Sequence, residues 1–169
     1  MTTPGPFDRA DLEQLYVRME RRVYNVVFRW VWSAEEAHDI VQEAFVRLWA
    51  MRARVRPETV EPLVWRIALN LARNRRRWLR LRSFFGLGEE AHPAPSADAV
   101  LSDTERALRV RAAVDALPEA QRSVILLTWF SELSYKEVAE LLKIPEGTVG
   151  SRRNHALAAL RASLGEVAP

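Results

Sequence analysis

The sequence predicts an all-α protein made of two small helical bundles joined by a flexible linker. Apolar residues recur at spacings of three and four along most of the chain, which indicates amphipathic helices. No segment alternates apolar and polar residues as a half-buried strand does. Across residues 83–103 the helical period stops, and Gly, Pro, Ser and Ala dominate. We therefore expect an N-terminal domain at 7–82, a linker at 83–103 and a C-terminal domain at 104–165 that contains a helix-turn-helix.

Composition narrows the class of protein. The 169 residues are 49% hydrophobic and 28% charged, as in a folded globular protein, and the chain has no cysteine for a disulfide or a thiolate zinc site. No apolar run approaches membrane-spanning length, so we expect a cytoplasmic protein that does not insert into membranes. Residues 1–82 hold 16 basic and 10 acidic side chains, whereas residues 83–169 hold 9 and 12. The excess of basic residues in the N-terminal half favours a polyanionic partner for that half.

The N-terminal domain is expected to contain three long helices. The first runs from about Phe7 to Trp32, with its apolar face formed by Leu15, Met19, Val23, Val26, Val27 and Trp30. The second begins after Ser33, where Glu36 three residues later completes a capping-box pattern. Residues 52–62 contain two prolines and are interpreted as a loop. The third helix runs from about Leu63 to Arg82.

Two charged clusters occur on these helices. Glu36, Asp39 and Glu43 form an acidic stripe beside Gln42, and taken alone this pattern favours an ordinary solvated face. The third helix carries six arginines, of which Arg73, Arg76, Arg77 and Arg80 have spacings that favour one side. Like charges this close repel each other, so the cluster favours binding to nucleic-acid phosphates. Trp78 between them is expected to pack inward.

The C-terminal domain is expected to begin with a helix over 103–117 and a strongly apolar helix after Pro118, whose apolar residues include Trp129. Residues 134–164 then predict a helix-turn-helix. Ser134 and Glu137 form a capping box, Pro145 starts the second helix, and Val149, Ala156, Leu160 and Leu164 form its buried side. Polar residues of the second helix point outward, where they could reach a DNA major groove: Thr148, Ser151, Arg152 and His155. A plain helical hairpin is the alternative.

Four segments together resemble the extracytoplasmic-function (ECF) sigma factors, small two-domain factors of bacterial transcription initiation. They are AEEAHDIVQEAFVRLW, VWRIALNLARNRRRW, LPEAQRSVILLTWF and LSYKEVAELLKIPEGTVGSR, in this order around a linker. The resemblance implies an alternative sigma factor that binds core RNA polymerase and directs promoter-specific transcription initiation. It also implies control by an anti-sigma factor, and it implies no catalytic residue and no cofactor.

The resemblance assigns roles to individual residues. The acidic helix would dock on the polymerase through Glu35, Glu36, Asp39, Gln42 and Glu43. The arginine helix would engage the proximal promoter element through Asn70, Arg73, Asn74, Arg76 and Arg77, with Arg80 on a phosphate. The 52–62 loop would take up an extruded base during promoter melting, although no pocket residue can be named there. The helix-turn-helix would read the distal element through Thr148, Ser151, Arg152, Asn154 and His155.

The chain departs from the family pattern after Val149. Gly150 stands where a basic residue is usual, and Arg153 stands where an aliphatic residue packs inward. We expect Leu157 to replace the lost apolar contact while Arg153 turns toward the DNA backbone. A glycine in the middle of a helix costs about 1 kcal/mol relative to alanine. Distal-element binding is therefore expected to be weaker than is usual in the family.

Three other functions compete with the sigma factor. A stand-alone helix-turn-helix regulator would have no need of the acidic helix, which separates the two hypotheses. An enzyme is disfavoured because the three histidines, His38, His92 and His155, lie on different segments and no phosphate loop or nucleophile motif occurs. An RNA-binding protein that uses the arginine helix alone would leave the second domain unexplained.

Overall fold

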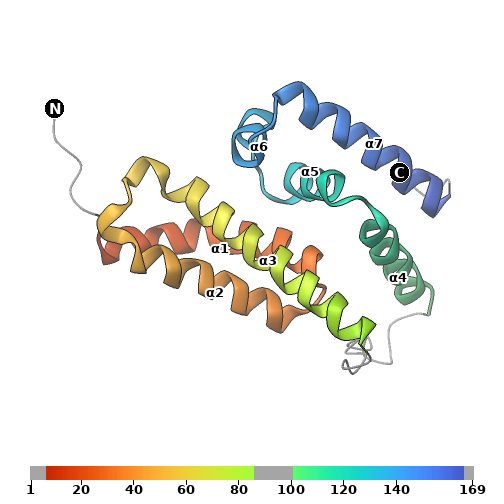
Figure 1. Ribbon diagram of the computed structural model, residues 1–169, viewed down its shortest axis with the longest axis horizontal. Coiled ribbons are helices and arrows are strands. Elements are labelled where there is room, and N and C mark those ends of the chain that lie inside the picture. Colours follow the sequence, from red (N-terminus) through yellow and green to blue (C-terminus); the bar gives the residue numbers. More distant parts are fainter. Residues whose placement is uncertain (1–6, 86–100, 166–169) are drawn as a thin grey trace. The chain divides into compact units, whose positions relative to one another are not determined.

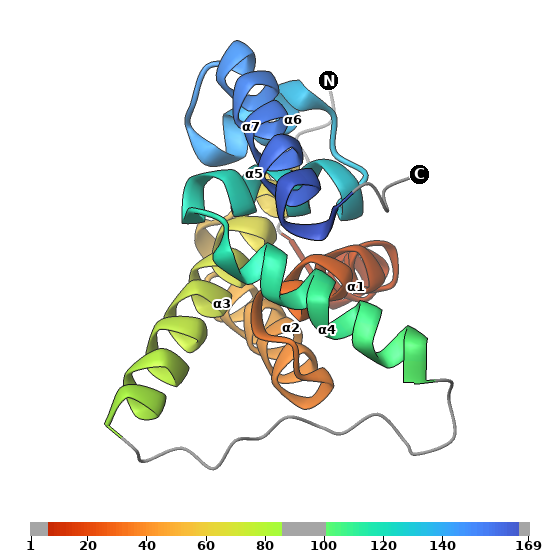
Figure 2. The ribbon, with the colours of Figure 1, turned by 90° about the vertical axis from the view of Figure 1, so that its right-hand side faces the viewer.

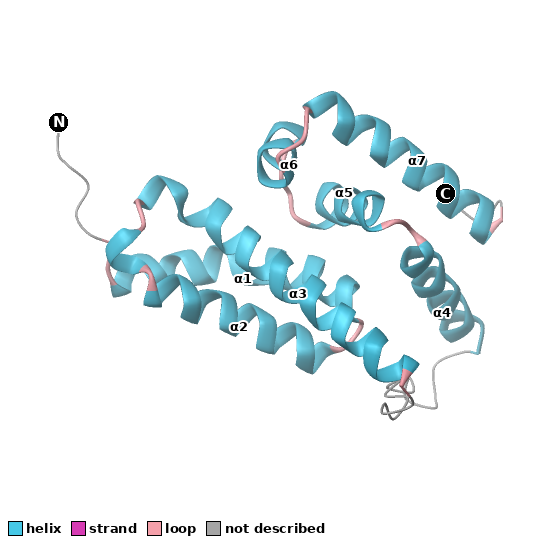
Figure 3. Cartoon of the chain, viewed as in Figure 1, coloured by secondary structure: helices cyan, strands magenta, loops and turns pink. Residues whose placement is uncertain are grey.

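The computed structural model describes residues 7–85 and 101–165, with side chains of the second range described from Thr104 onward. This part of the chain is helical with connecting loops, and it contains no strand (Figures 1 and 3). The α-helices are α1 (Arg9–Val31), α2 (Ala34–Ala50), α3 (Val60–Phe84), α4 (Leu101–Ala116), α5 (Glu119–Phe130), α6 (Tyr135–Leu142) and α7 (Glu146–Leu164). The all-α prediction is therefore confirmed.

The chain divides into two compact units, Met1–Glu90 and Ala91–Pro169, and each is described by itself. Within the first unit, α1, α2 and α3 lie side by side in a three-helix bundle (Figure 2). The apolar face expected on α1 forms part of its core, together with Ala37, Ile40, Val41, Ala44, Phe45 and Leu48 of α2. Trp30 and Trp65 are its largest fully buried side chains, and each is 1% exposed.

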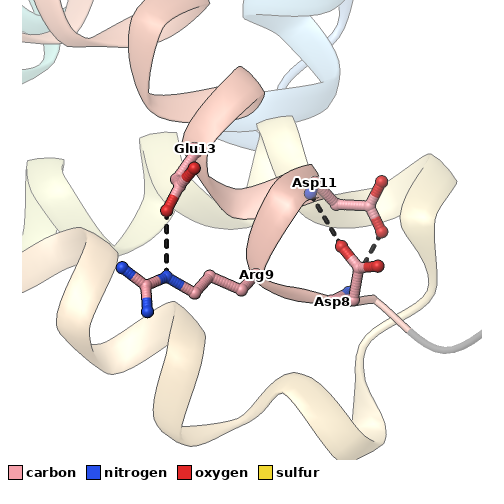
Figure 4. A network of polar contacts seen from close by, with 4 residues as sticks. All are labelled: Asp8, Arg9, Asp11 and Glu13. Carbon is pink, nitrogen blue, oxygen red and sulfur yellow. Dashed lines mark hydrogen bonds and ion pairs between the residues drawn. The ribbon is translucent and has the colours of Figure 1, made fainter.

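The start of α1 is fixed by its own side chains. Asp8 is the N-cap: its Oδ1 accepts a hydrogen bond from the Asp11 backbone N–H at 2.9 Å, and Asp11 Oδ2 accepts one from the Asp8 N–H at 3.0 Å (Figure 4). This capping box satisfies two N–H groups that have no partner inside the helix. The exposed Arg9 Nε donates to Glu13 at 2.9 Å on the next turn. Phe7 is buried just ahead of the helix.

The segment between α2 and α3 contains more regular structure than a plain loop. Two short 3₁₀ helices, Arg52–Arg54 and Pro57–Thr59, lead into α3, which begins at Val60 rather than Leu63. At its other end α3 continues to Phe84, and α4 already begins at Leu101, so both helices run into the range expected to be linker. Residues 86–100 of that expected linker lie outside the described residues.

In the second unit, α7 packs against α4, α5 and α6. The predicted capping box at the start of α6 is present: Ser134 N–H donates to Glu137 Oε2 at 2.7 Å, and Glu137 N–H donates to Ser134 Oγ at 3.3 Å. Lys143 ends α6 in the left-handed region at φ 54°, and Pro145 is the N-cap of α7. The helix-turn-helix is therefore formed as expected, with α7 beginning one residue after Pro145.

Two side chains of this unit have a burial that apolar content does not indicate. Trp129 belongs to the strongly apolar segment but is 46% exposed, because it follows the run of buried residues 122–127 and faces outward at the end of α5. Arg122, in contrast, is 3% exposed. Its guanidinium donates to the carbonyls of Val114, Asp115 and Leu117 at 2.9, 2.6 and 2.6 Å. A buried arginine thus bonds to carbonyls at the end of α4, where backbone donors are scarce, and the Val114 carbonyl also accepts from the Leu117 N–H at 3.2 Å.

Candidate nucleic-acid and protein interfaces

The outward face of α3 gathers part of the predicted DNA-binding set. Asn70, Asn74, Arg77 and Arg80 are exposed and are related by spacings of three, four and seven, which align them along one side of the helix. Arg66 is exposed on the same side one turn earlier. Residues 62–85 contain seven arginines and no acidic residue. This side of α3 therefore presents amide and guanidinium groups, which can hydrogen-bond to base edges and phosphates.

Arg73, Arg75 and Arg76 are only half-exposed and reach back to the corner between α1 and α2. Arg76 Nη1 donates to the carbonyl of Trp30 at 3.3 Å, and the Arg73 guanidinium lies 5.9 Å from the centre of the Trp30 ring. Arg76 follows the buried Ala72 by four residues, so it lies on the flank of the buried stripe. Arg73 and Arg76 therefore lie at the edge of the side on which Arg77 and Arg80 are fully exposed.

Three aromatic side chains at the end of α3 are exposed, and the expectation for one of them, Trp78, is wrong. Trp78 is 46% exposed instead of packing inward, and the Arg82 guanidinium lies 4.6 Å from the centre of its ring. Phe84 and Phe85 are 83% and 66% exposed and contact each other edge to face at 5.4 Å. The buried residues of α3 end at Ala72, so these rings lie beyond the packed part of the helix.

The acidic helix α2 presents most of its predicted docking residues. Glu35, Asp39, Gln42 and Glu43 are exposed, and Glu43 forms an ion pair with Arg47 one turn later at 2.9 Å. The side chain of Val46, which sequence reasoning did not single out, is 66% exposed at spacings of three, four and seven from Glu43, Gln42 and Asp39. The helix therefore carries a mainly acidic face with one exposed apolar side chain among the acids.

Glu36 is the exception in the acidic set. Ser33 Oγ accepts a hydrogen bond from the Glu36 N–H at 3.3 Å, which is one half of the expected capping box. The other half is absent because the Glu36 carboxylate binds Arg75 of α3: Nη1 donates to Oε1 at 2.9 Å and lies 2.7 Å from Oε2. The two side chains are 25% and 37% exposed.

In α7 the predicted DNA-binding residues divide into two groups. Ser151, Asn154 and His155 are exposed, whereas Thr148 and Arg152 are half-buried at the edge of the outward face. Ser151 Oγ donates to the carbonyl of Thr148 at 3.1 Å. Arg153 is half-buried at a spacing of four from the buried Val149, and Leu157 is also half-buried. Arg153 thus lies on the inward flank of the helix instead of turning outward.

Burial perturbs the pKa of two groups in the first unit. It lowers the pKa of Arg29, whose guanidinium donates to the carbonyl of Asn25 at 2.7 Å. Burial, with a smaller contribution from Glu20, raises the pKa of Tyr16. Arginine and tyrosine ordinarily titrate far above pH 7, so Arg29 stays charged and Tyr16 stays neutral at that pH.

Among the described residues, no group of three or more His, Cys, Asp or Glu side chains could hold a metal ion. In the same ranges, no helix has both the length and the apolar character needed to cross a bilayer.

Two family models match the chain, one in each unit. Residues 15–81 match sigma-70 region 2, and residues 107–160 match sigma-70 region 4. The RNA polymerase sigma-H factor of Pseudomonas aeruginosa is 28% identical over 86% of this chain and 81% of its own length. The ECF RNA polymerase sigma factor SigW of Bacillus subtilis is 29% identical over 92% of this chain and 88% of its own length.

Solved structures support the fold. CnrH, in complex with the cytosolic domain of CnrY, matches with a TM-score of 0.72 and 23% identity, over 95% of this chain and 92% of the other. The sigma factor RpoE of Bartonella quintana, in complex with the anti-sigma factor NepR, matches with a TM-score of 0.67 and 22% identity, over 94% of this chain and 99% of the other. These structures show the fold. The matches to sigma-70 regions 2 and 4 and to the curated relatives show that the chain belongs to the extracytoplasmic-function sigma factors of the sigma-70 family.

Proposed function

We propose that the protein is an alternative sigma factor that binds core RNA polymerase and directs promoter-specific transcription initiation. The observation that carries the proposal is the pairing, in one chain, of a region 2 match at 15–81 with a region 4 match at 107–160. Each matched region also contains the surface that the function needs: an acidic face and an arginine-rich helix in the first, a helix-turn-helix in the second.

Polymerase docking is assigned to the outward face of α2. The exposed Glu35, Asp39, Gln42 and Glu43 supply the charged and polar contacts, and Val46 supplies an apolar contact at the C-terminal end of this set. Acidic side chains beside a desolvated apolar contact steer and orient a basic partner surface. A stand-alone regulator that bound only DNA would gain nothing from this face, since it would repel phosphate.

Promoter binding is assigned to both units. The outward face of α3 contacts the proximal element through Asn70, Asn74, Arg77 and Arg80. The exposed face of α7 reads the distal element through Ser151, Asn154 and His155, with Thr148 and Arg152 at its edge. The segment between α2 and α3 takes up an extruded base, which requires a pocket that repays an unstacking cost of a few kcal/mol.

Regulation by an anti-sigma factor is part of the proposal. It is supported by the structural likeness to RpoE, whose structure contains the anti-sigma factor NepR. Such a partner would have to cover the acidic face of α2, the arginine helix α3, or both. The chain itself would then act by binding and not by catalysis, in the cytoplasm, where polymerase and promoter DNA meet.

Charge reversal on α2 tests the docking assignment. The double variant Asp39→Arg/Glu43→Arg should lower the affinity for core RNA polymerase about a hundredfold or more, because like charges facing each other across an interface cost several kcal/mol. The matched control is Glu105→Arg/Glu140→Arg, which makes the same charge change at two exposed acids of the second unit. Equal affinities of the wild type and the α2 variant in a titration of labelled protein with core polymerase would refute the assignment.

A further inference from the structure

The half of α3 that carries the proposed promoter-binding side chains has little apolar support of its own. The buried residues of α3 are Val60, Val64, Trp65, Ala68, Leu69 and Ala72. From Arg73 to Phe84 none is buried, although Asn74, Arg77 and Arg80 lie in this half. Some other interaction must therefore hold this half of the helix against the bundle.

Polar contacts to the α1–α2 corner supply that support. Arg75 pairs with Glu36 at 2.7–2.9 Å, and the next residue, Arg76, donates to the Trp30 carbonyl at 3.3 Å. Trp30 lies one residue before the end of α1, so its carbonyl is among the last four, which have no intrahelical donor. The Trp30 ring is 1% exposed, so the acceptor belongs to a rigid part of the core. Two contacts from adjacent residues thus fix α3 on two different helices.

The Glu36–Arg75 pair joins two helices and is half-buried. The Arg9–Glu13 and Arg47–Glu43 pairs join residues one turn apart and are largely exposed. Arg18 and Glu61 also pair between helices, α1 and α3, but their side chains are 55% and 39% exposed, against 37% and 25% for Arg75 and Glu36. Exposed pairs one turn apart contribute a few tenths of a kcal/mol to helix stability and do not orient one helix against another. A half-buried pair between two helices restricts their relative position, because both partners lose hydration if they separate.

We infer that Glu36, Arg75 and Arg76 form a positioning clamp, which holds the promoter-binding half of α3 on the α1–α2 corner and contacts neither DNA nor polymerase. The inference deepens the proposed function and rests on it. It removes Glu36 from the docking face and Arg76 from the phosphate contacts. It leaves Arg77 and Arg80 as the exposed cations that the clamp aligns with Asn74, whereas the exposed Arg82 lies over the Trp78 ring.

The substitution Glu36→Gln distinguishes the clamp from an unspecific charge effect, because the two predict opposite changes in promoter affinity. Glu36→Gln removes a negative charge next to the arginine cluster, so an unspecific charge effect would strengthen promoter binding. The clamp predicts a loss of about three- to tenfold in the promoter affinity of the reconstituted holoenzyme. Glu35→Gln is the matched control, because Glu35 is the exposed neighbour in the same turn of α2, and it should change the affinity less than twofold.

A charge swap completes the test. Arg75→Glu alone should weaken promoter binding strongly, and Glu36→Arg/Arg75→Glu should recover most of the loss, since the pair is restored with opposite polarity. If Arg75 contacts phosphate, the swapped protein will bind as weakly as the single variant. Recovery requires that the glutamate at 75 and the arginine at 36 can again meet, so a swap without recovery would overturn the clamp.

Two further measurements, affinity for core polymerase and circular dichroism, show whether a variant has lost docking or folding instead of helix positioning. Each variant is titrated with core polymerase: a selective loss there for Glu36→Gln, with promoter affinity unchanged, would return Glu36 to the docking face and overturn the inference. Circular dichroism confirms that each variant is folded at the assay temperature. Failure of the wild type to bind core polymerase would instead refute the proposed function, and Glu36→Gln would still be tested on the free chain by its affinity for a promoter duplex.

Discussion

The two helices proposed to contact promoter DNA are held in place in different ways. In α7 the buried side chains Val149, Ala156 and Leu160 extend over most of the helix, so apolar packing fixes its whole length. In α3 the buried side chains end at Ala72, and the DNA-facing half that follows is held through Glu36 and the Trp30 carbonyl. The first arrangement resists salt, whereas the second depends on charge and on side-chain geometry.

The same contrast applies to the chemistry that each helix presents. From Arg73 to Arg82, α3 has six arginines and no acid, whereas α7 has three arginines, of which Arg152 and Arg153 are half-buried. The predicted DNA-binding residues that α7 exposes are uncharged or weakly basic, Ser151, Asn154 and His155, and its exposed arginine, Arg161, lies near the end of the helix. This difference indicates that α3 supplies most of the counterion-dependent affinity and that α7 supplies shape and hydrogen bonding.

The largest effect is expected when Arg122, the buried arginine that bonds to carbonyls in the second unit, is replaced. Arg122→Ala should destabilise this unit by about 3–5 kcal/mol, because the carbonyls of Asp115 and Leu117 lose the donor that a buried guanidinium provides and the Val114 carbonyl keeps only its bond from the Leu117 N–H. Native-state hydrogen exchange of α5 amides measures the change, and α1 amides of the first unit serve as an internal reference. Arg109→Ala, an exposed arginine of α4, is the control. Unchanged protection of α5 in Arg122→Ala would contradict this account of Arg122.

An intermediate effect is expected for the exposed arginines of α3. Arg77→Gln/Arg80→Gln should reduce the slope of log affinity against log salt concentration by about 1.8, because two phosphate contacts no longer release counterions. Arg152→Gln in α7 should reduce it by about 0.9 at most, since this side chain is half-buried. Promoter binding by the holoenzyme over a series of salt concentrations gives both slopes. Equal slopes for the wild type and the α3 variant would remove the contrast between the helices.

The smallest expected effect concerns Gly150 in the middle of α7. A Cβ built at this position meets nothing within 4 Å, and its backbone is helical, so Gly150→Ala should stabilise the second unit by about 0.5–1 kcal/mol. Gly147→Ala, in the first turn of the same helix, is the matched control and should gain less. Hydrogen exchange of α7 amides measures both. A destabilised Gly150→Ala would show that the open space at this position is filled by another group.

Local sequence signals predicted the helices but not the contacts between them. The capping box of Ser134 was found because both partners lie within four residues and compete with nothing else. Only one of the two hydrogen bonds of the same pattern forms at Ser33. The Glu36 side chain does not return to the Ser33 backbone because it has a partner 39 residues away, which no local pattern reveals. Arg75 and Arg76 were treated as part of one charge cluster, although their long side chains reach adjacent helices.

Apolar residues at helix ends were the second source of error. Trp78 and Trp129 are of a residue type that is usually buried. Each lies beyond the last buried position of its helix and is exposed there. Sequence spacing gives the side of a helix on which a residue lies and does not say how far the partner helix extends. Arg122 carried a usable signal, since one arginine inside the apolar segment 120–130 requires buried acceptors.

The central claim, that this chain directs RNA polymerase to promoters, is tested most directly by transcription in vitro. Purified core polymerase is incubated with and without the protein on a mixed pool of promoter fragments, and the transcripts are sequenced. The account predicts transcripts from a defined subset of fragments only when the protein is present, with none when Asp39→Arg/Glu43→Arg replaces it. Tight binding of the protein to promoter DNA without core polymerase, and no new transcripts with it, would contradict the claim and favour a stand-alone helix-turn-helix regulator.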